Sequence, residues 1–167
     1  MSALQNKIDF VALVSVTMAN SNGDPLNGNR PRTNYDSRGE ISDVCIKRKI
    51  RNRLQDMGQC IFVQSDDRCD DGCASLRDRA EQAIKGVKDR NEYARLACEK
   101  WIDVRSFGQV FAFKEKKKGD GVSVGVRGPV SIHQALSVSP VEIESLQITK
   151  SVNGETPSKK EAAEEET

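Results

Sequence analysis

The spacing of the apolar residues changes near residue 102, and this change restricts the possible folds more than any other feature of the chain. In the helices expected between residues 42 and 101, apolar residues recur every three or four positions, as on one face of an α-helix. Beyond residue 102 they alternate with polar residues, as in a half-buried strand. Helices followed by neighbouring strands favour an α+β fold with an antiparallel sheet.

Three helices are predicted before the change. In the first, Ile46, Ile50, Leu54 and Met57 form one stripe that is expected to face the core. Ser42 or Asp43 can cap its start, and Gly58 can end it. The other two helices are expected at 75–87 and 89–101, with buried side chains at Leu76, Ala80, Ala83, Ile84, Val87, Tyr93, Leu96, Ala97 and Trp101.

Strands are expected before the first helix and between the first and second helices. Residues 7–18 are rich in β-branched and apolar types and predict a buried first strand, and residues 60–63 predict a short second one. Between the first strand and the first helix, residues 19–40 are predicted to be a long polar loop.

After the helices, a hairpin and further extended segments are expected. The hairpin strands are predicted at 104–113 and 122–126, joined by a basic turn. Two more extended segments follow at 129–138 and 141–148.

Acidic and basic residues are unevenly distributed along the 167-residue chain. The net charge is only +1, but residues 151–167 carry five Glu and two Lys, so the rest of the chain is mildly basic. We therefore expect one domain over residues 1–150 and an acidic, disordered tail over 151–167. Without a long apolar run or an export signal, the sequence predicts a cytoplasmic protein with free cysteines and no membrane partner.

The first predicted helix carries five basic residues and no acidic residue after Asp43. Lys47, Arg48 and Arg51 share one face, whereas Lys49 and Arg53 flank the apolar stripe. Like charges at this spacing repel, and an anionic partner would offset the repulsion. The preceding loop adds Arg30, Arg32 and Arg38, so the pattern favours binding of an RNA or DNA backbone over a merely solvated helix face.

Enzymatic patterns are weak by comparison. The single histidine, His133, lies in an extended segment without a neighbouring nucleophile. Cys69 and Cys73 could share a zinc ion, but no second pair at usable spacing completes four ligands. The glycines lack the ending of a phosphate-binding loop. No catalytic residue, metal or cofactor is therefore expected.

Four segments, taken in order, resemble the repeated backbone subunit of type I CRISPR-Cas surveillance complexes (Cascade), most closely the type I-C form. They are Asn22–Pro25, Ser42–Asn52, Asp103–Gly108 and Val126–Ser131. The resemblance covers roughly residues 7–154.

The resemblance implies a modified RNA-recognition-motif (ferredoxin-like) palm with helical fingers and a thumb insertion. Copies of the subunit would stack head to tail on the CRISPR RNA, together with other Cascade subunits, and target DNA would pair with the guide. Members of the family are longer, so the chain is expected to be truncated where the thumb begins.

By the same resemblance, Ser42, Lys47, Arg48 and Arg51 would hold the guide phosphates beside the loop from Asn22 to Asn27. Arg105, Phe107 and Arg127 would support the palm, with Arg105 also within reach of RNA. Combined with the basic surface, the predicted RNA-binding residues are Asn22, Asn27, Arg30, Arg32, Ser42, Lys47, Arg48, Lys49, Arg51 and Arg105.

Two alternatives to a non-catalytic scaffold remain open. Related backbone subunits of other CRISPR types are metal-dependent ribonucleases that cut with a thumb-region aspartate, but residues 151–167 contain no aspartate, so no cleavage is expected. The other alternative is an interaction module whose acidic tail binds a basic partner.

Overall fold

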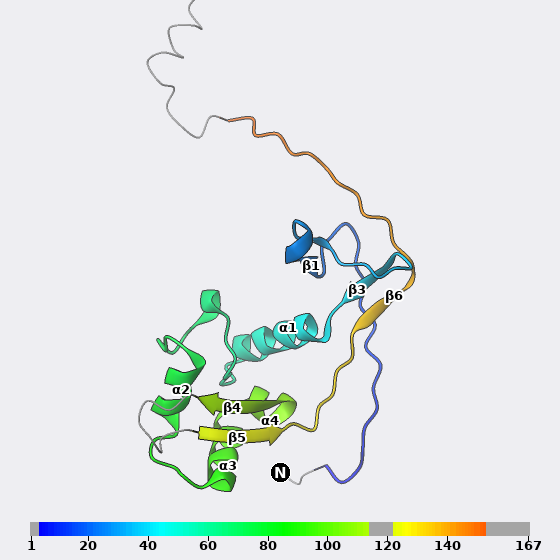
Figure 1. Cartoon of the computed structure of the whole chain (residues 1–167). Coiled ribbons are helices and arrows are strands. Elements are labelled where there is room, and N and C mark those ends of the chain that lie inside the picture. Colours follow the sequence, from blue (N-terminus) through cyan, green and yellow to red (C-terminus); the bar gives the residue numbers. More distant parts are fainter. Residues whose placement is uncertain (1–3, 114–121, 153–167) are drawn as a thin grey trace, which may run out of the picture.

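The computed structural model describes residues 4–113 and 122–152, and it is an α+β fold as predicted (Figure 1). The α-helices are α1 (Asp43–Asp56), α2 (Leu76–Ala83), α3 (Arg90–Lys100) and α4 (Ile102–Phe107). The strands are β1 (Gly23–Asp24), β2 (Arg30–Pro31), β3 (Arg38–Ile41), β4 (Gly108–Phe113), β5 (Val122–Arg127) and β6 (Ala135–Pro140). Short 3-10 helices occupy Pro25–Asn27 and Asp66–Arg68.

The hydrophobic core lies where α2, α3 and α4 gather around the β4–β5 hairpin (Figure 1). Aromatic rings form its centre: Phe62 is 4.7 Å from Trp101 and 5.0 Å from Phe111, measured between ring centroids. Offset and tilted rings at these distances stabilise one another beyond the effect of burial. Five of the eight aromatic residues of the chain thus lie in this cluster: Phe62, Tyr93, Trp101, Phe111 and Phe113.

The three predicted helices are confirmed, each with an N-cap. The Ser42 hydroxyl accepts a hydrogen bond from the Cys45 amide at 3.2 Å, and Ser75 and Asp89 cap α2 and α3 in the same way. Of the expected buried side chains, those that reach full burial are Ala80, Ile84, Tyr93, Ala97 and Trp101. The second helix ends earlier than predicted, at Ala83.

The predicted apolar stripe of α1 is not part of this core. Ile46, Ile50 and Leu54 are half-buried, Met57 is 61% exposed, and α1 contributes no fully buried residue. The expectation that the stripe faces the core is therefore wrong for the described residues. The helix is attached instead through the side chains of Arg48 and Arg51, whose partners lie in the body of the fold.

The predicted first strand is also corrected. Residues 7–18 pair with no described strand and expose their apolar side chains, among them Val11 at 88% and Leu13 at 91%. A strand of this composition needs neighbours on its backbone edges and on its face, and the described residues supply none. In the predicted polar loop that follows, β1 and β2 form a small antiparallel pair.

Two other strand predictions are wrong, each for its own reason. Residues 102–107 form α4 instead of the start of a strand, so Trp101 and Val104, three positions apart, both reach the core. Residues 60–63 are not a strand, because the amides of Phe62 and Val63 donate to the carboxylate of Asp103 rather than to a neighbouring strand.

The hairpin is confirmed, with a register from Gly108 opposite Arg127 to Phe113 opposite Val122. Its predicted basic turn, 114–121, lies outside the described residues. The strand β6 overlaps the end of the predicted segment 129–138 and continues to Pro140, and it pairs antiparallel with β3. Residues 141–148 form no strand. Each described sheet has two strands, and the RNA-recognition-motif palm stays a prediction. None of the described helices has the length and apolar character needed to span a membrane.

Candidate nucleic-acid interface

The start of α1 is held by Asn22, from the first motif. Its Oδ1 accepts hydrogen bonds from both the backbone amide and the hydroxyl of Ser42, each at 2.9 Å. Ser42 in turn caps α1. Both residues were predicted to bind RNA, and the structure uses their polar groups to orient the basic helix.

The middle of α1 is held by an ion pair with a buried carboxylate. Asp103 is fully buried, and its Oδ2 lies 3.0 Å from Nε of Arg51, whose side chain is only 13% exposed. The same carboxylate accepts the amide hydrogens of Phe62, at 2.7 Å, and Val63, at 3.0 Å. The Arg51 guanidinium also lies 5.2 Å from the ring centre of Phe107. The anionic partner of Arg51 is thus inside the protein.

Arg48 and Lys47 also have partners within the chain. Arg48 donates to the carbonyl oxygen of Val63 at 2.7 Å and to Asn52 at 3.3 Å, and partial burial lowers the pKa of its guanidinium. Lys47 pairs with Asp43 at 3.0 Å, and this hydrogen bond holds the pKa of the Asp43 carboxyl below its ordinary value. Lys47 remains partly exposed.

The remaining predicted RNA-binding residues do not form one cluster. Lys49 and Arg105 are exposed, as is Asn27, the last residue of the first 3-10 helix. Arg30 is exposed and donates to the Ser145 hydroxyl at 3.4 Å. Arg32 lies 4.0 Å from a carboxylate oxygen of Glu40. The structure therefore separates the predicted set into internally bonded residues and exposed ones.

The third and fourth motifs meet at two glycines. A Cβ on Gly128 would lie 2.3 Å from the carbonyl oxygen of Ser106 and 2.4 Å from the amide nitrogen of Gly108. Val130 donates to the same Ser106 oxygen at 2.9 Å. This close approach of two backbones requires glycine. In the sequence, the feature that points to this backbone contact is the presence of the third and fourth motifs.

One structural cation was missed by the sequence reasoning. Arg79, only 6% exposed, pairs with both carboxylate oxygens of Asp71 and donates to the carbonyl oxygen of Phe62 at 2.9 Å. The Asp71 pKa is held well below its ordinary value, chiefly by this hydrogen bond. Arg79 lies three positions after Leu76, on the buried face of α2, and that placement was the available signal.

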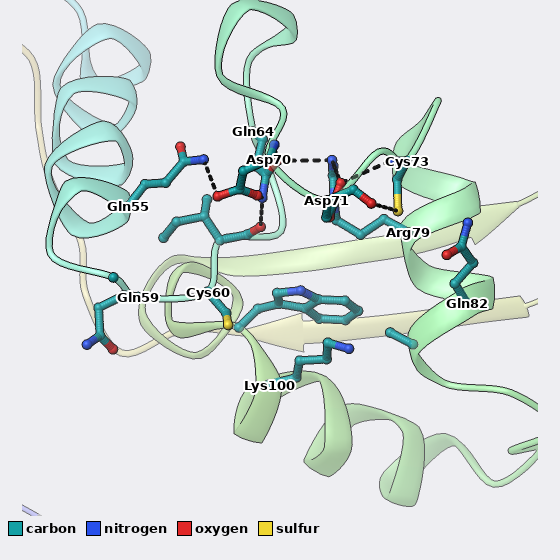
Figure 2. A pocket seen from close by; sticks show the side chains of 14 residues that line it. Gln55, Gln59, Cys60, Gln64, Asp70, Asp71, Cys73, Arg79, Gln82 and Lys100 are labelled. Atoms are coloured by element: carbon teal, nitrogen blue, oxygen red, sulfur yellow. Dashed lines mark hydrogen bonds and ion pairs between the residues drawn. The ribbon is translucent and has the colours of Figure 1, made fainter.

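Arg79 and Asp71 line a pocket of about 360 Å³, shown in Figure 2. Its polar side chains are bonded mainly to one another: Asp70 accepts from Gln55 at 2.8 Å and from Gln64 at 2.7 Å. The acidic side chains of the pocket are thus bonded to other side chains that line it. Among the described residues, no group of three His, Cys, Asp or Glu side chains is placed to hold a metal ion.

Comparison with known proteins places these motifs in a family. The chain is 26% identical over 155 residues to a protein of Haloferax volcanii described as "CRISPR-associated protein Cas7". The match covers 82% of this chain but only 44% of the relative, so the chain spans less than half of the relative's length. The family described as CRISPR-associated protein Cas7 matches residues 6–167. The chain therefore belongs to the Cas7 family.

Proposed function

We propose that the chain is an RNA-holding part of a non-catalytic backbone subunit of a type I Cascade complex, closest to the I-C form. The observation that carries this proposal is the contact between successive motifs. Asn22 bonds Ser42, Arg51 of the second motif bonds Asp103 and contacts Phe107, and Gly108 packs against Gly128. The four segments that resemble the family therefore form one connected frame around α1.

In this proposal the frame presents cations to a guide RNA. The exposed or partly exposed candidates are Arg30, Lys47, Lys49 and Arg105, whereas Arg48 and Arg51 position the helix. Such cations would hold phosphates without reading bases, so sequence recognition is left to pairing between guide and target DNA. Head-to-tail copies and other Cascade subunits would extend the same track along the guide.

The proposal is tested by fluorescence anisotropy with two labelled single-stranded RNAs of unrelated sequence. We expect equal affinities for both, and a fall of tenfold or more when salt rises from about 50 to 200 mM, as phosphate contacts require. Absence of binding at low salt, or a strong preference for one sequence, would contradict the proposal.

The absence of catalysis is tested with the same RNAs. The purified chain is incubated with magnesium ions and the RNA is resolved on a denaturing gel. We expect full-length RNA. Shortened RNA that persists through ion-exchange and size-exclusion purification would favour the alternative of a metal-dependent ribonuclease.

A further inference from the structure

A second hollow, of about 750 Å³, lies between Lys47 of α1 and two neighbouring stretches of chain, 107–110 and 125–133. We call it the basic groove. Three of the side chains that line it are Lys47, Arg127 and His133, and none of its lining residues is acidic. The pocket in Figure 2, in contrast, contains Asp70 and Asp71. Of these two hollows, only the basic groove has the charge that suits an anion.

Arg127 and His133 are available for a ligand. Both are exposed, and neither side chain makes a hydrogen bond or ion pair with another described residue. Arg48 and Arg51, in contrast, donate to protein groups. Among the described residues, Lys47 pairs with partly exposed Asp43, and surface i,i+4 ion pairs of this kind contribute little to stability, so a phosphate can replace the contact.

The groove also has the shape and surface that a nucleic-acid strand requires. Glycines at 108, 125 and 128 line it, and a Cβ on Gly125 would meet nothing within 4 Å, so a ligand can approach the backbone closely. Phe107, an aromatic residue, is also part of the lining. Basic side chains beside an aromatic ring are the usual combination in grooves for single-stranded nucleic acid.

We propose that the basic groove holds the phosphates of single-stranded RNA, with Arg127 and His133 as contacts beside Lys47. This inference rests on the proposed function and adds where the strand runs. It gives Arg127, which the family resemblance placed in support of the palm, a direct contact with the ligand. Figure 1 shows the connection from β5 to β6, which carries His133, running past the β3 end of α1.

The test compares three double variants of the full chain for binding to one labelled single-stranded RNA. Arg127→Ala with His133→Ala removes the groove contacts, and Lys49→Ala with Arg53→Ala removes two exposed cations of α1 that do not line the groove. Lys85→Ala with Lys88→Ala is the control, because these exposed lysines lie between α2 and α3. Thermal unfolding checks that each variant is folded.

We expect the groove variant to bind about tenfold more weakly and to lose about one to two units of salt slope, one per phosphate contact. The control is expected to bind within twofold of the wild type. Wild-type affinity in the groove variant would overturn the inference and leave the proposed function intact. Failure of the wild type itself to bind RNA would instead overturn the proposed function.

Cross-linking provides a readout that needs no variant. RNA containing 4-thiouridine is irradiated with the wild-type chain, and the adducts are mapped by mass spectrometry. Adducts within residues 125–133 are expected, and adducts confined to residues 49–53 would overturn the inference. Binding of an acidic peptide of residues 160–167 to the groove, with RNA binding unchanged in the groove variant, would also overturn it in favour of a protein partner.

Discussion

Individual arginines of similar appearance in the sequence have different roles in the structure. Arg51 is paired with a fully buried carboxylate, Arg48 donates to a backbone carbonyl, and Arg53 on the same helix is exposed. The spacing of basic residues on α1 could be predicted from the sequence, as could its cap. The inward direction of Arg48 and Arg51 could not, because it depends on Asp103, which lies 52 positions beyond Arg51 and which no local pattern connects to it.

Replacing Asp103 by Asn is predicted to destabilise the fold by about 3 to 5 kcal/mol, because Arg51 keeps a charge without its buried partner. Urea unfolding measures the change. Glu99→Gln is the control: it breaks an exposed pair with Arg95 and should change stability by less than about 1 kcal/mol. Equal stability of Asp103→Asn and wild type would contradict the structural role given to Asp103.

Asp71 is predicted to make stability dependent on acid pH. Its pKa is lowered in the fold by Arg79, so the unfolded chain binds the proton more readily. The contribution is complete above the unfolded pKa of about 3.9 and is lost as pH falls below it towards the folded value. The stability difference between wild type and Asp71→Asn, measured by urea unfolding, should be constant from pH 5 to 7 and shrink below about pH 4. A difference that grows in acid would contradict this account.

At the scale of elements, local signals predicted helices better than strands. Caps and apolar spacing located α1, α2 and α3, and alternation located the β4–β5 hairpin. The strand prediction at 60–63 failed because the backbone there donates a hydrogen bond to a side chain instead of to a strand. The prediction at 7–18 failed because no described strand pairs with this segment. The basic groove is lined by residues of both α1 and the end of β5, so neither segment alone predicts it.

The junction of α4 with the hairpin is predicted to tolerate no side chain at Gly128. Gly128→Ala would place a Cβ against the backbone of Ser106 and Gly108, and overpacking of this kind costs about 1 to 3 kcal/mol. Gly125→Ala, in β5 three positions before Gly128 and with open space around it, is the matched control. A lower midpoint in thermal unfolding for Gly128→Ala alone is expected, and equal midpoints would argue against the close approach.

At the scale of the whole molecule, much apolar surface is left uncovered. The low hydrophobic content of 37% is combined with exposed side chains along 7–18 and a half-buried stripe on α1. The chain also spans only 44% of its Haloferax relative. The composition shows only that hydrophobic residues are few, whereas the structure shows which apolar segments are exposed.

Limited proteolysis should reveal the uncovered segment. Chymotrypsin is predicted to cut the chain near Phe10 and Leu13, which are 65% and 91% exposed, before it cuts at the fully buried Phe62 and Phe111. Mass spectrometry of the first fragments identifies the sites. Protection of residues 7–18 together with early cleavage at Phe62 would contradict the arrangement described.

The central claim, that this chain holds RNA through its phosphates, is tested most directly by the nucleic acid that copurifies with it. The absorbance ratio at 260 and 280 nm is measured after purification at low salt, after a high-salt wash, and after ribonuclease treatment. We expect bound RNA that ribonuclease destroys and that salt removes, since phosphate contacts weaken steeply with ionic strength. Protein that purifies free of RNA and then fails to bind added single-stranded RNA at low salt would contradict it.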